Sequence, residues 1–175
     1  MVTTTRLMSP EDAPVLAALL RSNRDFLAPW EPDREDSYFT EEGQLAVVRD
    51  ALDWYEAGTH VPHVIVDDDG RVVGRITLSG IVRFSLQSAS VGYWVSEHAN
   101  GRGHATAALR SMIAVAFGDL GLHRIQAETL KHNAASQRIL ERAGFERYGL
   151  APEYLRIAGR WQDCVMYQLI NRDMA

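Results

Sequence analysis

Residues 100–106 have the sequence Asn100-Gly101-Arg102-Gly103-His104-Ala105-Thr106, and they join a predicted strand to a predicted helix. The N-terminus of a helix carries unpaired backbone N–H groups and the positive end of the helix dipole. The two glycines have no side chain to keep phosphate oxygens away from those amides, and Arg102 adds a charged donor. The stretch therefore predicts a binding site for a diphosphate group.

Two other glycine-rich phosphate loops fit this turn less well. A Walker loop ends in Gly-Lys-Ser/Thr, whereas the only lysine of the chain, Lys131, lies far downstream. A dinucleotide-binding fingerprint needs a third Gly or Ala where this chain has Thr106, and it belongs to a parallel doubly wound sheet. Taken alone, the turn is also compatible with a glycine-rich connection that binds nothing.

The segments on both sides of the turn predict a mixed α/β fold. Apolar residues at helical spacing predict an amphipathic helix that begins at Ala105 and stops at Gly121. The strand before this helix and the strand after it form a strand–helix–strand unit, which implies one parallel pair. The other segments are a hairpin turning at Asp69-Gly70 and a helix over 134–143, and the strands are predicted at 63–66, 71–78, 90–95, 124–130, 153–157 and 165–170.

The first third of the chain is predicted to be mainly helical. A strand over 3–8 precedes a helix that Ser9 caps and that runs to about Asn23. Two prolines and several large apolar residues in 26–32 predict a packed loop. A second helix begins at the cap Thr40, with Gln44 as an approximate capping-box partner, and ends at Gly58.

Length and composition limit the class of protein. The 175 residues are 46% hydrophobic, which predicts a single domain over 1–175. The net charge of −5 argues against direct binding of nucleic acid, because that affinity comes mainly from clustered Lys and Arg. No apolar stretch approaches the roughly 20 residues that span a bilayer, so no membrane partner is expected. One cysteine, Cys164, and the lack of a secretory signal predict a cytoplasmic protein, with the thiol buried in packing.

Several motifs together resemble a known superfamily. Gly92-Tyr93-Trp94-Val95, the turn at 100–106, Asn133-Ala134-Ala135-Ser136 and Ala143-Gly144-Phe145 resemble the GNAT superfamily of N-acetyltransferases. Its cofactor signature, Gln/Arg-x-x-Gly-x-Gly/Ala, is matched at 100–105, except that Asn100 is shorter than Gln or Arg. Glu153-Tyr154-Leu155, the hairpin 159–163 and the early segment 26–30 are similar to the RimJ/RimL branch, which acetylates the N-termini of ribosomal proteins.

The resemblance implies a fold and a cofactor. The implied GNAT fold has a mostly antiparallel sheet with one parallel strand pair splayed around acetyl-CoA, flanked by about four helices. Acetyl-CoA is the implied cosubstrate, with no metal; His60 and His63 lack a third ligand of suitable spacing. Asn133 is expected to bind the pantetheine arm, and Trp94 and Val95 to offer backbone groups. The expected cofactor-binding residues are Trp94, Val95, Asn100, Gly101, Arg102, Gly103, His104, Ala105, Thr106, Asn133 and Ser136.

The reaction suggests roles for two further side chains. Acylation of an amine needs a deprotonated nitrogen, a polarised thioester carbonyl and a proton for the departing thiolate. By the resemblance, Glu153 is the candidate base and Ser136 the candidate acid, and a backbone N–H of Trp94 or Val95 meets the carbonyl oxygen. A solvated glutamate and a helix-capping serine are the structural alternatives. Trp30, Tyr154 and Trp161 are candidates for contact with the acceptor, or for packing.

Three functions are compatible with these residues. The first is acetylation of an amine, preferably the N-terminal α-amine of a protein or peptide, whose pKa of about 8 leaves roughly a tenth neutral at pH 7. The second is acetylation of a small molecule such as an antibiotic, a polyamine or an amino acid. The third is a non-catalytic acyl-CoA-binding domain, which would have no need of both Ser136 and Glu153. A monomer and a homodimer are equally compatible with the sequence.

Overall fold

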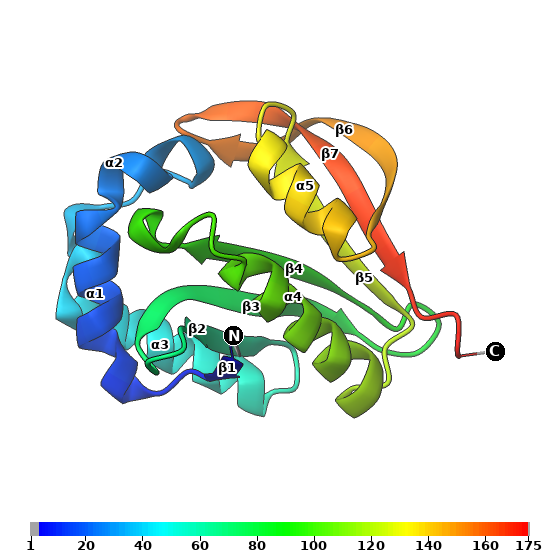
Figure 1. Cartoon of the computed structure of the whole chain (residues 1–175), viewed down its shortest axis with the longest axis horizontal. Helices are drawn as coiled ribbons and strands as arrows, with labels where there is room; N and C mark the ends of the chain where they lie inside the picture. The colour runs from blue at the N-terminus through cyan, green and yellow to red at the C-terminus, as the bar shows by residue number, and fades with distance from the viewer. Residues whose placement is uncertain (1–3, 175) are drawn as a thin grey trace.

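The computed structural model describes residues 4–174, and its centre is a seven-stranded mixed sheet in the order β1-β2-β3-β4-β5-β7-β6 (Figure 1). Every neighbouring pair is antiparallel except β4 with β5, which confirms the predicted fold class. Thr3, part of the first predicted strand, lies outside the described residues. The strands are β1 (Thr4–Leu7), β2 (Val61–Val66), β3 (Val72–Val82), β4 (Ser88–Val95), β5 (Arg124–Leu130), β6 (Glu146–Ile157) and β7 (Arg160–Ile170).

Helices cover both faces of this sheet. α4 and α5 lie on one face, where Leu109 and Leu140 join the largest core cluster (Figure 1). α1 and α3 pack on the opposite face, where Leu16 and Val48 meet Val64. The alternation of β2 explains this arrangement, because successive side chains of a strand point to opposite faces. The helices are α1 (Ala13–Ser22), α2 (Arg24–Leu27), α3 (Glu41–Glu56), α4 (His104–Ala114), which continues into a π-helical turn (Val115–Asp119), and α5 (Ala134–Arg142).

The parallel pair β4–β5 separates along its length. The strands are paired only from Ser88 with Arg124 to Ser90 with Gln126. Beyond this point β4 stays paired with β3, and β5 stays paired with β7. Figure 1 shows the two strands diverging toward α2. The facing edges of β4 and β5 therefore have backbone groups without a partner strand in the middle of the sheet.

The segment after α1 differs from its prediction as a loop. Residues 24–27 form the single helical turn α2, and a 3₁₀ turn (Ala28–Trp30) follows it. Pro29 is compatible with this turn because it lies in the first positions, where a missing N–H costs no helical hydrogen bond. With α2, residues 4–174 contain five α-helices, against the expected number of about four, and the additional one is this single turn.

The start of α3 confirms one part of the predicted cap and corrects the other. The Thr40 side chain accepts a hydrogen bond from the Gly43 N–H at 3.0 Å, as expected for an N-cap. Gln44 does not complete a capping box. Its Nε2 donates instead to the Tyr38 carbonyl at 2.6 Å, because Gln44 lies one position beyond the one that reaches back to the cap.

The C-terminal hairpin β6–β7 is longer than predicted and contains a bulge. Ala151 pairs with Cys164 and Leu155 pairs with Gln162, so the three residues 152–154 lie opposite Asp163 alone. Glu153 has a φ of +46°, and the Asp163 carboxylate accepts its N–H at 3.0 Å. Bulges of this kind change the direction of the side chains they carry. Cys164 is buried, as predicted.

Candidate active site

The turn at 100–106 has the backbone that its glycines predict. Gly101 and Gly103 have φ of +74° and +86°, a left-handed conformation that other residues adopt at a cost. No atom lies within 4 Å of the position that a Cβ would occupy at either glycine, so the space beside them is open. The first hydrogen bond of α4 runs from the Ala107 N–H to the Gly103 carbonyl at 3.0 Å. The amides before Ala107 belong to the helix end that favours anions.

A cavity of about 490 Å³ leads from this turn to the place where β4 and β5 diverge. We call it the larger cavity. It brings together all of the predicted cofactor-binding residues except Arg102, which is exposed in the same turn. The residues that line it are Phe26, Leu27, Trp30, Tyr93, Trp94, Val95, Ala99, Asn100, Gly101, Gly103, His104, Ala105, Thr106, Asn133, Ala135, Ser136, Arg138, Ile139 and Arg142.

Sequence reasoning gave no role to three polar residues of this lining. Arg138 and Arg142 lie one turn apart on α5. Their spacing of four residues in the sequence predicts two basic side chains on one face of a helix, and this pattern could have indicated the basic wall of the larger cavity. The third residue is Tyr93, whose hydroxyl lies 3.0 Å from Ser136 Oγ. Burial raises the pKa of Tyr93 to about 12, so its hydroxyl keeps its proton at neutral pH and can donate to Ser136.

Asn133 and Ser136 also organise the start of α5. The Asn133 Oδ1 accepts a hydrogen bond from the Ser136 N–H at 3.1 Å, so Asn133 is the N-cap of the helix. This bond uses the side-chain oxygen and leaves Nδ2 without a partner among the described residues. The capping role is thus compatible with a second role for the same side chain in binding an acceptor group.

A second cavity of about 150 Å³, the smaller cavity, lies between the separated parts of β4 and β5. It shares Trp30, Tyr93, Asn133 and Ser136 with the larger cavity, so the two cavities meet at the hydrogen-bonded pair Tyr93–Ser136. Its remaining lining consists of Val91, Gly92, Ala127, Glu128, Thr129, Leu130, Leu140, Leu155 and Ile157.

The predicted acceptor residues and the predicted base have different locations. Trp30 lines both cavities, and its ring lies against His132 with the centroids 5.3 Å apart. Tyr154 and Trp161 are 45% and 61% exposed and line neither cavity. Glu153 is also exposed and lines neither, because the bulge holds it on the surface of the hairpin.

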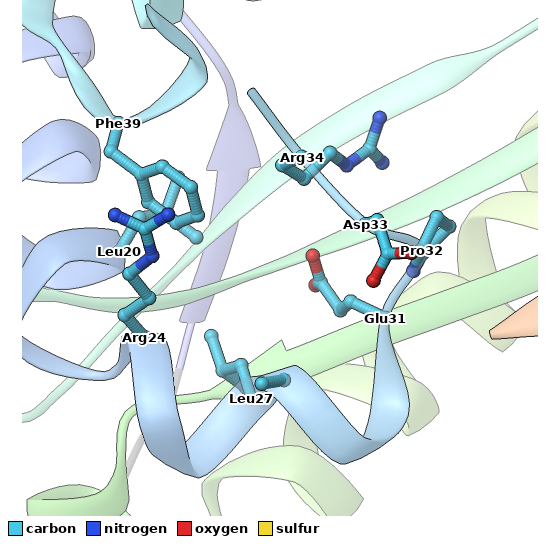
Figure 2. A pocket seen from close by; sticks show the side chains of 9 residues that line it. Leu20, Arg24, Leu27, Glu31, Pro32, Asp33, Arg34 and Phe39 are labelled. Carbon is cyan, nitrogen blue, oxygen red and sulfur yellow. The ribbon is translucent and has the colours of Figure 1, made fainter. Parts of the chain in front are cut away.

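The segment that carries Trp30 contacts the C-terminal hairpin. The Ala158 N–H donates to the Glu31 carbonyl at 3.2 Å, which joins the tip of the hairpin to the segment after α2. The Glu31 side chain lines a third cavity of about 170 Å³ (Figure 2). Burial raises the pKa of Glu31, and the charges of Arg34 and Arg75 partly oppose that shift. Figure 2 shows Glu31 near Asp33, and Arg24 lying over the Phe39 ring at 4.3 Å.

Residues 4–174 contain no cluster of three His, Cys, Asp or Glu side chains that could hold a metal ion. The His63 ring nitrogen Nδ1 lies 3.1 Å from Thr5 Oγ1, and the His60 ring packs against Trp54 with the centroids 4.8 Å apart. Among the same residues, no helix is both long enough and apolar enough to cross a membrane.

The fold and the site together define an acetyl-CoA-dependent N-acetyltransferase. An anion-binding turn opens into a cavity that ends at two unpaired strand edges, and these features suit a long ligand with a diphosphate at one end and amides along its arm. The protein-family model of the acetyltransferase (GNAT) domain matches residues 3–146 of the sequence. The chain therefore belongs to the GNAT family of acetyltransferases.

Curated relatives and solved structures agree with this assignment. The chain is 34% identical over 169 residues to the probable N-acetyltransferase YjcK of Bacillus subtilis, covering 96% of this chain and 93% of the relative. It is 33% identical to the ribosomal protein uS5-alanine N-acetyltransferase of Escherichia coli, covering 96% and 87%. The structure of Mycobacterium smegmatis RimJ in complex with CoA-disulfide superposes with a TM-score of 0.94 at 28% identity, covering 98% of this chain and 83% of that one.

Proposed function

We propose that this protein transfers the acetyl group of acetyl-CoA to the N-terminal α-amine of a protein, such as a ribosomal protein. The observation that carries the proposal is the junction of two cavities at Tyr93 and Ser136, because a two-substrate transfer needs one compartment for each substrate and a common point between them. The named activity of the Escherichia coli relative, acetylation of an alanine of uS5, supports a protein N-terminus as the acceptor.

The residues of the larger cavity suit acetyl-CoA, which supplies the activated acetyl carbonyl. In this proposal the amides of residues 101–106 bind the diphosphate, and Arg102, Arg138 and Arg142 add positive charge around it. Asn133 Nδ2 is available to a pantetheine carbonyl. The Ser96 N–H donates to Val73 of β3, so strand alternation puts the Trp94 N–H on the β3 side and the Val95 N–H on the edge that β5 leaves. The Val95 N–H polarises the thioester carbonyl.

Ser136 and Glu153 handle the protons. Ser136 donates its proton to the departing thiolate, the Tyr93 hydroxyl 3.0 Å away donates a hydrogen bond to the serine oxygen, and the serine regains a proton from solvent. Glu153 acts as a base on the acceptor side, directly or through a water molecule. Its exposure on the bulge of β6 suits a group that passes protons to solvent.

The smaller cavity suits the first residue of the acceptor. Its volume of about 150 Å³ and its apolar wall of Leu155 and Ile157 favour a small side chain such as that of alanine. Trp30 borders the entrance from one side, and the exposed Tyr154 and Trp161 offer contacts to the following residues of the peptide. We place this activity in the cytoplasm, with residues 1–175 acting as one acetyltransferase domain.

The test is an acceptor panel. The purified protein is incubated with acetyl-CoA and separately with peptides that begin with Ala or Ser, a lysine peptide blocked at its N-terminus, polyamines and aminoglycosides. Release of free thiol and the mass of the product are followed. We expect rapid acetylation of the peptides with a free small first residue. A preference for polyamines or aminoglycosides would assign the protein to small-molecule acetylation, and thiol release with no acceptor would leave a CoA-binding domain.

A further inference from the structure

Glu128 is a carboxylate on the wall of the smaller cavity, in the middle of β5. Ile125 and Ala127 point into the core beneath α4 and α5, so strand alternation places Gln126 and Glu128 on the opposite face of the sheet. Gln126 donates to the Tyr148 hydroxyl of β6 at 2.8 Å, so the side chains on this face of β5 meet those on the same face of the C-terminal hairpin. Glu128 is therefore held on the face from which the acceptor would approach.

This carboxylate has no hydrogen bond or ion pair with any of the described residues. Burial raises its pKa, and no nearby cation offsets the effect. A charged group that is removed from water without a partner is costly, and such groups concentrate at functional sites. The smaller cavity thus contains a carboxylate that lacks a hydrogen-bonding partner among the described residues.

We propose that Glu128 receives the protonated α-amine of the acceptor inside the smaller cavity and takes its first proton. This role rests on the proposed function, and it adds a residue that the sequence did not suggest. The cavity places Glu128 on the opposite side of the β4–β5 gap from Tyr93, so an amine held by Glu128 lies between the carboxylate and the point where the two cavities meet.

The reaction releases two protons from the amine, so Glu128 and Glu153 can each accept one. An ammonium group that becomes an amide loses two protons, the departing thiolate gains one, and one proton goes to solvent. Glu128 accepts the first proton and so produces the neutral nucleophile. The nitrogen loses its second proton as the N–C bond forms and the C–S bond breaks, which is the step left to Glu153. A partly buried carboxylate suits the first step, because low polarity favours the neutral acid and neutral amine over the ion pair.

The experiment compares Glu128→Gln with wild type, using saturating acetyl-CoA and a peptide that begins with Ala. We expect kcat/KM for the peptide to fall about 100-fold at pH 7, the low end of the range for a general base. The deficit should shrink about tenfold by pH 9, because the amine, with a pKa of about 8, is then mostly neutral in solution. Binding of the peptide to the enzyme–CoA complex, measured by calorimetry at pH 7, should weaken in parallel.

The titratable groups around Glu128 bear on the comparison between pH 7 and pH 9. The titratable groups that feel its charge are Tyr154 of β6 and Cys164 of β7, and each has a pKa above its ordinary value. Tyr93 of β4 lines the same cavity, and burial raises its pKa as well. The charge of Glu128 is the largest cause of the shift at Tyr154. Asp163, which Lys131 contacts at 3.4 Å, has a lowered pKa and stays ionised. The Glu153 side chain lies on the neighbouring bulge.

Matched variants distinguish an error in the role of Glu128 from a loss of structure and from an error in the proposed function. Glu146→Gln, the same change at an exposed position of β6, should retain the wild-type rate. Affinity for CoA and thermal stability of Glu128→Gln should be equal to or above the wild-type values, since the variant removes a buried charge. A deficit below about threefold, or one that is equal at pH 7 and pH 9, overturns the role of Glu128. A wild-type enzyme that acetylates no peptide contradicts the proposed function instead.

Discussion

The larger and the smaller cavity share four residues but are built in different ways. The larger one is lined mainly by residues from two continuous segments, 93–106 and 133–142. The smaller one is lined by residues from five separate parts of the chain, represented by Trp30, Tyr93, Glu128, Ser136 and Leu155. A cosubstrate common to a family can thus be bound by local motifs, whereas the acceptor side depends on how distant segments meet.

The largest effect is expected from a substitution in the glycine-rich turn at 100–106. Gly103→Val forces a β-branched residue into a left-handed conformation, at about 1–2 kcal/mol, and places a side chain on the open side of the turn. When the turn relaxes out of that conformation, its amides no longer point at the diphosphate, and the loss of one or two charge-assisted hydrogen bonds should lower CoA affinity about 300-fold by calorimetry. Gly118→Val is the control, since its Cβ position is also open and its φ is not positive. Equal affinities for the two variants would disprove the role of the turn.

The next largest effect is expected from a substitution on the acceptor side of the site. Glu153→Gln should lower kcat about 100-fold in steady-state assays while CoA affinity stays near the wild-type value, because Glu153 does not line the larger cavity. The same substitution at Glu146 is again the control. Loss of CoA binding with unchanged turnover would remove Glu153 from the acceptor side.

A smaller effect is expected where the two cavities meet. Tyr93→Phe removes the hydrogen bond to Ser136 and should lower kcat about fivefold, the equivalent of roughly 1 kcal/mol. Ser136→Ala should cost more, and the double variant should cost no more than Ser136→Ala, because the hydroxyl of Tyr93 acts through Ser136. Strictly additive losses would show that the two hydroxyls act independently.

The smallest effect concerns Glu31, which lies beside Trp30 but lines neither cavity. Burial raises its pKa, so the folded state favours the protonated form and the ionised form costs stability at pH 7. Glu31→Gln should raise the Tm by a few degrees at pH 7, since 1 kcal/mol corresponds to about 2–4 °C in a chain of this size. The gain should vanish as the pH falls below about 4, where the carboxyl is protonated in both states. Thermal unfolding at several pH values, with unchanged acetylation, provides the check.

Much of the fold could be predicted from the sequence. The glycines at 101 and 103, the helix after them and the parallel pair around that helix follow from residues close together in the chain. Turn conformation, helix capping and hydrophobic period are set mainly by neighbours, which is why they are readable from one sequence. The segment 26–32 was predicted as a loop because its prolines dominate the local signal, and its packing against distant elements gave it a helical turn instead.

The sequence by itself determined the diphosphate turn, the strand and helix pattern and, through resemblance, the chemistry of the family. Only the tertiary structure decided that Tyr93 meets Ser136, that a bulge holds Glu153 at the surface, and that Glu128 lines the gap between the strands. These three facts depend on strand register and on where β4 and β5 separate. Register is a property of pairing between segments tens of residues apart, and a shift of one residue would turn each of these side chains to the other face.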